Sequence, residues 1–300
     1  MEAALTLVRA VHFAAVIVLF GQFAYAYAVA PDGRMPPRFR AVAAASLGIA
    51  IVSSIAWLFL EASHMSGLAM GAAWQAGAVG TVLTQTHFGN VCVVRLVVAL
   101  VAAGAVFAMD SGRSPVARAL GALAALFILA SLAACGHAAA GSGAQGAIRL
   151  TADAFHLAAA GAWLGALVPF AALLARSTNA AGDLARAHGA ARRFSTLGAA
   201  SVVAIVFTGI INARYTVQTL AALTGSRYGI ELLVKIAIFV AILAIAALNR
   251  WRLTPRVATT LAGPAALRAL RLNTMLEIAL GFAIVAIVGN LGITMPPAHH

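Results

Sequence analysis

Two histidines in apolar segments have the clearest chemical potential in this 300-residue sequence. His12 lies in Arg-Ala-Val-His-Phe-Ala-Ala and His156 in Asp-Ala-Phe-His-Leu-Ala-Ala, and a glycine, Gly21 or Gly165, follows each at the same spacing. An ionisable side chain inside an apolar helix is costly, so it is a candidate functional group by default. The two matching segments predict a polar site that is either duplicated or shared between two related halves of the chain.

Asp153 and His137 extend this candidate site. Asp153 precedes His156 by one helical turn, so its carboxylate can orient the imidazole as a metal ligand. His137 ends an apolar run in Cys-Gly-His-Ala. Helix geometry places His12 and His156 at one depth, roughly 10 Å below the outer membrane surface. We therefore expect His12, His137, His156 and Asp153 to converge in the outer third of the bundle and to bind a metal ion.

A second set of soft ligands follows in the outer connections. His64, Met65 and His87 combine imidazole and thioether groups, the set that suits Cu(I), and Met70 and Met295 lie on the same side. A hard cation would require more carboxylates than the 8 acidic residues provide. The terminal pair His299 and His300 is left out of the site, because terminal histidines can belong to a purification tag.

The composition predicts an integral membrane protein. Hydrophobic residues make up 63% of the chain, charged residues only 9%, and the mean hydropathy is +0.97. The net charge of +12 would suggest nucleic acid binding in a soluble protein, but the arginines cluster between apolar runs and set topology instead. No P-loop, nucleophile elbow or zinc-protease motif is present, so we expect neither ATP-driven pumping nor enzymatic hydrolysis. Cys92 and Cys135 lack metal-site spacing.

The predicted fold is all-α, with eight transmembrane helices. The apolar runs fall at 4–28, 41–62, 91–109, 116–136, 150–175, 195–216, 229–250 and 272–294. Alternate connections contain most of the 20 basic residues, which places those connections in the cytoplasm and both termini outside. The outer connection at 63–90 is expected to form a short helix on the membrane surface.

A second repeated pattern supports two related halves, 1–145 and 146–300. Residues 83–96 resemble residues 223–236, and the match places Arg95 and Lys235 at equivalent positions. Because each half has four helices, the two repeats insert in the same orientation, related by an axis along the membrane normal. We also expect Glu231 to neutralise Lys235 one turn away, and Glu277 to pair with a loop arginine.

Several short motifs together resemble the copper resistance protein D family of bacterial inner-membrane proteins. In chain order they are Asp153-x-x-His156, Ala160-Gly-Ala-Trp163-Leu-Gly165, Arg193-Phe-Ser195, Thr208-Gly209, Tyr228-Gly-x-x-Leu-x-x-Lys235, Asn249-Arg250, Glu277 and Pro296. The match covers about 150–297, the copper resistance D domain, and the first half resembles the family through His12 and the Gly-His-Ala that contains His137.

The resemblance implies an eight-helix inner-membrane protein that moves copper, usually from periplasm to cytoplasm. Both termini would then be periplasmic. It also implies a separate periplasmic copper-binding partner of the copper resistance protein C type. The intramembrane histidines of the family correspond to His12, His137 and His156 in this sequence.

Two other functions are compatible with the same residues. The chain could be a b-type haem membrane oxidoreductase, with His12 and His156 as axial ligands from facing helices. It could also be an assembly or sensor protein that binds metal without moving it. The leading hypothesis is a copper permease, in which Cu(I), or Cu(II) reduced on entry, reaches a histidine-rich site near the outer face.

Overall fold

The computed structural model describes residues 1–30, 38–109, 115–136, 143–217, 219–259 and 261–294, and within these ranges the chain is helical without strands. Eight of the described helices are long and apolar enough to cross a membrane. They are α1 (Glu2–Ala28), α2 (Phe39–Ser66), α5 (His87–Ala108), α6 with the 3-10 turn η3 (Pro115–Cys135), α7 with the π-helical turn η5 and α8 (Gly143–Arg176), α9 (Ala181–Thr216), α11 with the π-helical turn η6 and α12 (Arg227–Val257), and α13 (Gly263–Leu291). The predicted all-α fold with eight spans is confirmed.

Several helices extend beyond the apolar runs that predicted them. α9 begins at Ala181 rather than at residue 195, and α13 begins at Gly263 rather than at residue 272. The added turns contain arginines, which hydropathy excludes from a span although they continue the helix. Hydropathy therefore locates the membrane-crossing part of each helix and underestimates its full length.

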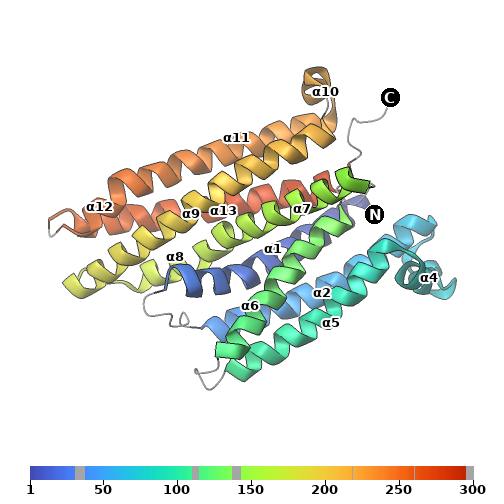
Figure 1. Ribbon diagram of the computed structural model, residues 1–300, viewed down its shortest axis with the longest axis horizontal. Helices are drawn as coiled ribbons and strands as arrows, with labels where there is room; N and C mark the ends of the chain where they lie inside the picture. The colour runs from blue at the N-terminus through green and yellow to red at the C-terminus, as the bar shows by residue number, and fades with distance from the viewer. Residues whose placement is uncertain (31–37, 110–114, 137–142, 218, 260, 295–300) are drawn as a thin grey trace.

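α1 is the central helix of the bundle. It packs against α2 and α6 of the first half and against α8 and α13 of the second, and Figure 1 shows it running through the middle of the molecule. Its fully buried Val16 and Leu19 belong to one hydrophobic core that also includes Leu167 and Leu267. The two halves therefore share a single core. The predicted division at residue 145 falls in the first turn of α7 and stays a prediction.

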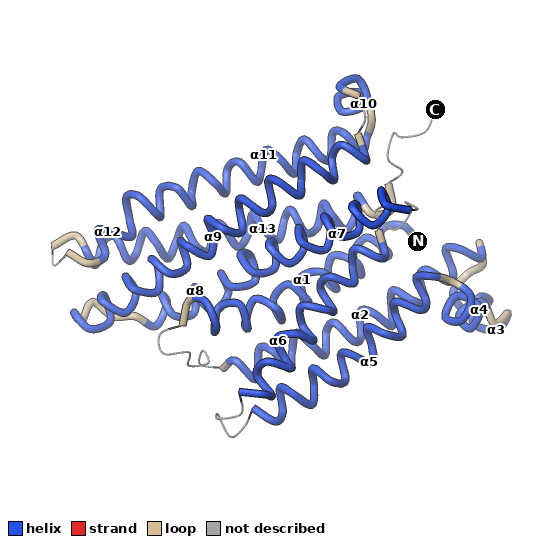
Figure 2. The backbone as a smooth tube through the Cα atoms, viewed as in Figure 1, coloured by secondary structure: helices blue, strands red, loops and turns tan. Residues whose placement is uncertain are grey.

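Short helices cover one end of the bundle. α3 (Met70–Gln75) and α4 (Ala78–Gln85) replace the single surface helix expected at 63–90, and α10 (Leu220–Gly225) lies at the same end (Figures 1 and 2). α1 begins and α13 ends at this end as well.

The second repeated pattern corresponds to a repeated local structure. The Thr86 hydroxyl accepts the Gly89 N–H and caps α5, and the Ser226 hydroxyl accepts the Gly229 N–H and caps α11, each over 3.0 Å. A Cβ on either glycine would collide with backbone of the preceding short helix. The pattern thus encodes a short helix, a hydroxyl cap and a long helix in each half. Superposition of the complete halves stays a prediction.

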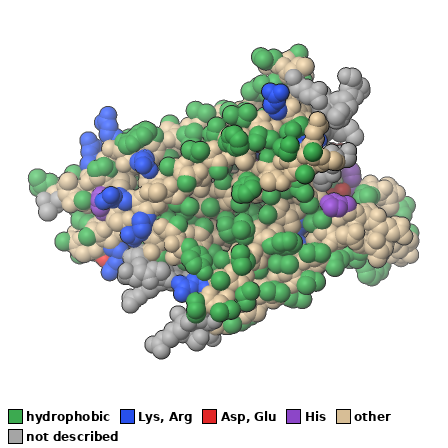
Figure 3. Space-filling view, in the orientation of Figure 1, with side chains coloured by type: hydrophobic (Ala, Val, Ile, Leu, Met, Phe, Trp, Pro, Cys, Tyr) green, Lys and Arg blue, Asp and Glu red, His purple; other side chains and the backbone are tan. Residues whose placement is uncertain are grey.

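Basic side chains gather at the opposite end. Figure 3 shows Lys and Arg concentrated where α12 and the connection between α8 and α9 lie, away from the N-terminus. Apolar side chains cover the length between the ends, as a lipid-facing surface requires. This distribution agrees with the alternate basic connections of the sequence.

The two matching glycines of the sequence meet in space. A Cβ on Gly21 of α1 would overlap the backbone of Gly165, and a Cβ on Gly165 would lie 2.8 Å from the Cα of Gly21. Gly165 ends the π-helical turn, and Pro169, four residues later, cannot donate a backbone hydrogen bond to its carbonyl. Small residues here allow two helix backbones to touch, as in other membrane bundles.

This contact generates the first prediction. Gly21→Ala and Gly165→Ala should each lower the thermal unfolding temperature of the detergent-purified protein, because overpacking a tight contact costs about 1–3 kcal/mol. Gly104→Ala is the matched control: nothing lies within 4 Å of its added Cβ, and alanine favours the helix. Equal unfolding temperatures for all three variants would contradict a packing role for the glycine pair.

Candidate polar site in each half

His12 is buried and anchored to α2 through one ring nitrogen. Its Nδ1 lies 3.1 Å from the Ala50 carbonyl oxygen and 3.0 Å from the Ser53 hydroxyl oxygen. The Ser53 hydroxyl donates its own hydrogen to the Ile49 carbonyl over 2.6 Å. Since a carbonyl can only accept, Nδ1 must carry the hydrogen. Nε2 is then left with a free lone pair, and this buried atom has no hydrogen-bond partner in the described ranges.

His156 repeats this arrangement in the second half. Its Nδ1 lies 3.0 Å from the Thr208 hydroxyl on α9, which donates to the Ala204 carbonyl over 2.6 Å. The imidazole also bonds the Ile205 backbone, one turn before Thr208. Each imidazole therefore contacts a backbone carbonyl and a hydroxyl group three residues later, both on the membrane span that follows its own. The two similar sequence segments around the histidines thus form similar hydrogen bonds to a neighbouring helix.

Asp153 lies beside His156 and faces the same helix. Its Oδ1 accepts from Asn212 Nδ2 over 3.0 Å, and Asn212 is one turn beyond Thr208 on α9. Lys235 of α11 is within electrostatic reach of both Asp153 and His156. The predicted common face of the aspartate and the histidine is therefore correct, although the carboxylate bonds Asn212 and not the imidazole.

The surroundings of His12 carry more positive charge. The guanidinium carbons of Arg9 and Arg95 lie 4.6 and 5.8 Å from the ring centroid of Trp57, and the His12 ring lies 5.8 Å from it. The Trp57 indole N–H donates to Glu61 over 3.0 Å. One carboxylate thus accompanies two buried guanidinium groups around a single indole.

Arg95 is held from the side of the fourth span. Its Nε donates to the Ser131 hydroxyl over 3.0 Å, and Nη2 contacts the Ser131 carbonyl at 3.3 Å and the Cys135 sulfur at 3.0 Å. Within the part of the chain that the structure describes, Nη1 has no hydrogen-bond partner, and neither has Nε of Arg9. These bonds fix the guanidinium and leave one edge available.

The predicted ligands do not all gather in one place. His12 bonds α2 and His156 bonds α9, so each lies in a polar cluster of its own half. Within the described ranges, no three His, Cys, Asp or Glu side chains form a group that could hold a metal by themselves. His137 and Met295 lie outside the described residues. His64, Met65 and Met70 are exposed near α3, and His87 is exposed at the start of α5.

Two predicted ion pairs are wrong. Glu231 bonds Arg227 over 3.1 Å and Asn290 over 2.8 Å in place of Lys235. Glu277 accepts from Asn249 over 2.6 Å rather than from a loop arginine. In each case an amide from a neighbouring helix satisfies the carboxylate without a second buried charge, and Glu231 also pairs with the exposed Arg227.

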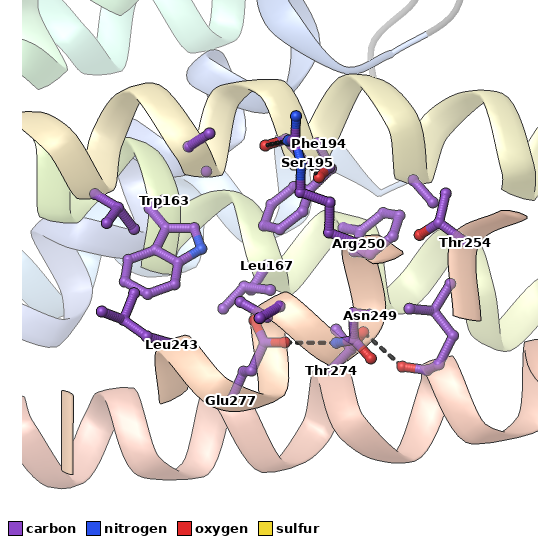
Figure 4. Close-up of a pocket in the computed structure, with 18 of the residues that line it drawn as sticks. Trp163, Leu167, Phe194, Ser195, Leu243, Asn249, Arg250, Thr254, Thr274 and Glu277 are labelled. Atoms are coloured by element: carbon purple, nitrogen blue, oxygen red, sulfur yellow. Dashed lines mark hydrogen bonds between the residues drawn. The ribbon is translucent and has the colours of Figure 1, made fainter. Parts of the chain in front are cut away.

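Glu277 lines a cavity of about 450 Å³ towards the arginine-rich end of the second half. Figure 4 shows its carboxylate bonded to Asn249, with Trp163 at one end of the cavity and Thr254 at the other. Arg250 lies between them and donates to the Ser195 hydroxyl. The lining is mostly apolar and includes no His, Cys or Met among the described residues. This cavity therefore offers no soft ligand, and the histidine clusters remain the better candidate sites.

Comparison with known proteins decides the family. Residues 1–147 match the family described as "Copper resistance protein D-like, N-terminal domain", and residues 188–291 match "Copper resistance protein D". "Copper resistance protein D" of Pseudomonas syringae pv. tomato is 30% identical over 93% of this chain and 91% of its own. The chain belongs to the copper resistance protein D family.

Other relatives agree with this assignment. "Inner membrane protein YebZ" of Escherichia coli (strain K12) is 28% identical over 83% of this chain and 84% of its own. "Copper transport protein CutJ" of Bacillus subtilis (strain 168) is 26% identical over 68% of this chain and 37% of its own. No solved structure matches the chain. The names of these relatives do not support the haem alternative. The contacts of His12 with α2 and of His156 with α9 do not support it either, since each histidine lies in a polar cluster of its own half.

Sequence reasoning missed the residues that hold the histidines. Ser53, Thr208 and Asn212 are polar residues in apolar runs, which is a detectable signal. Their pairing with particular histidines depends on which helices become neighbours, and periodicity does not show that. Trp57, which lies between the two buried arginines, gave no signal beyond its apolar surroundings.

Proposed function

We propose that this membrane protein transports copper and that His12 and His156 are copper ligands through their Nε2 atoms. Membership of the copper resistance protein D family supports a copper-related membrane function, and the name of the Bacillus subtilis relative supports transport. Transport by ligand exchange requires no catalysis by the chain. Copper is then the cargo and not a resident cofactor.

The observation on which the proposal depends is the tautomer of the two histidines. In both, the oxygen of a hydroxyl group lies 3.0 Å from Nδ1, and the same hydroxyl donates its hydrogen to a backbone carbonyl. The hydroxyl can therefore only accept from Nδ1, so Nδ1 carries the ring hydrogen. A hydrogen bond at one ring nitrogen orients the ring and raises the basicity of the other nitrogen. Neutral imidazole with a free Nε2 suits Cu(I) and Cu(II).

Asp153 and Lys235 give the second half a means of balancing the charge of the cargo. The Lys235 ammonium interacts electrostatically with the Asp153 carboxylate. A copper ion bound at His156 would compete for the same carboxylate. The Lys235 ammonium would then neutralise Asp153 until copper binds and takes its place. This limits the free-energy cost of a buried charge in a medium of low dielectric constant.

The direction that we propose is import across the bacterial inner membrane. The basic end of the bundle faces the cytoplasm and both termini are periplasmic. His64, Met65 and His87 lie at the periplasmic end, where they would accept copper from a periplasmic protein of the copper resistance C type. His137 follows the fourth span in the sequence, and we include it among the proposed ligands.

Topology is tested by reporter fusions. A fusion after Gly225, beyond α10, should give alkaline phosphatase activity, because the periplasm allows that enzyme to fold. A fusion after Ser177, between α8 and α9, should instead give cytoplasmic fluorescence from a green fluorescent protein. The reversed pattern would place the histidines on the cytoplasmic side and contradict the proposal.

Copper handling is tested by removing the ligands. His156→Ala and His12→Ala should each lower copper accumulation by cells and abolish one binding event in the purified protein. Asp153→Asn should weaken binding at His156 by about 10–100-fold, the usual effect of a residue that supports a ligand. Met70→Leu is the control, since Met70 is exposed and leucine has a similar size and also favours a helix. If the folded histidine variants accumulate as much copper as the parent protein, His12 and His156 are not the ligands, and His64, Met65 and His87 become the better candidates.

The anchoring hydroxyls allow a finer test. Thr208→Val removes the hydroxyl on which the His156 ring leans, with little change in volume, and Thr208→Ser restores it. We expect the valine variant to bind copper about 10–100-fold more weakly than the serine variant. Equal affinity in the two variants, measured by competition with a Cu(I) chelator, would show that the hydroxyl does not position the ligand.

A further inference from the structure

The cluster around Trp57 in the first half has a charge that a bare copper ion does not suit. Arg9, His12 and Arg95 are 5%, 1% and 2% exposed, and all three surround the Trp57 ring. Glu61 is the carboxylate bonded to that ring and the one that interacts electrostatically with Arg9. Two guanidinium groups against one carboxylate leave a buried positive charge, and a bare copper ion would add a further positive charge to it.

Three nitrogen atoms of this cluster have no hydrogen-bond partner among the described residues: Nε of Arg9, Nη1 of Arg95 and Nε2 of His12. The first two are donors with permanent positive charge. The third has a lone pair, because Nδ1 carries the ring hydrogen. The site therefore offers two donors for an anion and one ligand for a soft metal, around the same indole.

We propose that the first-half site binds copper as a cuprous halide and not as a bare ion. Cu(I) in chloride solution forms the anionic dichloro complex, which the two arginines would attract. His12 Nε2 would displace one chloride: a copper–nitrogen bond forms, one copper–chloride bond breaks, the free chloride leaves and copper stays Cu(I). The remaining chloride would accept from Arg9 and Arg95. This inference rests on the proposed copper function and specifies the chemical species at one of its two sites.

The fixed positive charge distinguishes this site from its counterpart. Lys235, the sequence equivalent of Arg95, interacts with Asp153 beside His156. Arg95 instead bonds the neutral groups of Ser131 and Cys135, which leave its charge uncompensated. Arginine also stays protonated at any pH that the protein meets. The second half suits a copper cation, and the first half suits copper accompanied by an anion.

Chloride dependence gives opposite expectations for the two kinds of site. At a bare site, added chloride competes with the protein for Cu(I), so the apparent affinity falls. At a mixed site, chloride is part of the bound species, and the affinity is higher in chloride than in nitrate. The experiment uses the full-length His156→Ala protein in detergent, under anaerobic conditions, with Cu(I) competed against a chromophoric chelator in sodium chloride or sodium nitrate.

Arg95→Gln in the same background should weaken Cu(I) binding about 10–100-fold in chloride and change it little in nitrate, because the arginine supports the halide and not the nitrogen ligand. Arg214→Gln is the matched control, since Arg214 is an exposed arginine in the last turn of α9. Its affinity in both salts should equal that of the parent.

X-ray absorption at the copper edge supplies a measurement that needs no arginine variant. With bromide in place of chloride, the His156→Ala protein should show one bromide and one nitrogen neighbour of copper. Nitrogen neighbours alone, with affinity that falls in chloride, would overturn the cuprous halide and leave copper binding at His12 intact. Absorption at the bromine edge that shows bound bromide without a copper neighbour would also overturn it. Failure of His12 to bind copper in either salt would overturn the proposed function at that residue.

Discussion

The contact between Gly21 and Gly165 fixes how the two halves of the molecule meet. α1 can lie at the centre of the bundle only because its backbone touches the fifth span directly, where any Cβ would overlap the other chain segment. The π-helical turn and Pro169 shape the fifth span at this point. Because His12 and His156 precede these glycines at equal spacing, the contact also sets the position of each histidine relative to the other half.

A second constraint is the absence of water within the bilayer, which makes a buried polar group without a partner inside the protein costly. Ser53 and Thr208 meet it by donating to a carbonyl in their own helix and presenting an oxygen to a histidine. This arrangement consumes one nitrogen of each imidazole and leaves the other for a ligand. The similar anchoring of the two histidines, with different charged neighbours, is what we expect of two related halves whose sites differ.

The sequence predicted the fold well because hydropathy and charge report directly on the membrane. Eight spans, the basic end and the surface segment after α2 all depend on local composition. The helix ends were less accurate, since the first turns of α9 and α13 are charged and continue the helix outside the apolar window.

The candidate site was predicted only in its elements. His12, His156 and Asp153 were identifiable as ionisable residues in apolar runs, but their partners were not. Glu231 illustrates the reason: Lys235 is one turn away in sequence, yet the carboxylate bonds Asn290 of another helix. Side-chain pairing between helices depends on rotation about each helix axis, and a single sequence contains little information on that angle.

The two clusters suggest how a cation can enter a chain with an excess of positive charge. A bilayer-embedded protein with many arginines repels a bare ion unless a carboxylate or an accompanying anion reduces the charge that is buried. In the function that we propose, Asp153 provides the first solution near His156, and Lys235 gives up its interaction with that carboxylate. Arg9 and Arg95 around Trp57 require the second, because guanidinium groups cannot lose their charge. Copper that passes between such sites would exchange both its ligands and the negative group that accompanies it, chloride in the first half and the Asp153 carboxylate in the second. In each half the copper ion and its negative partner would then have almost no net charge.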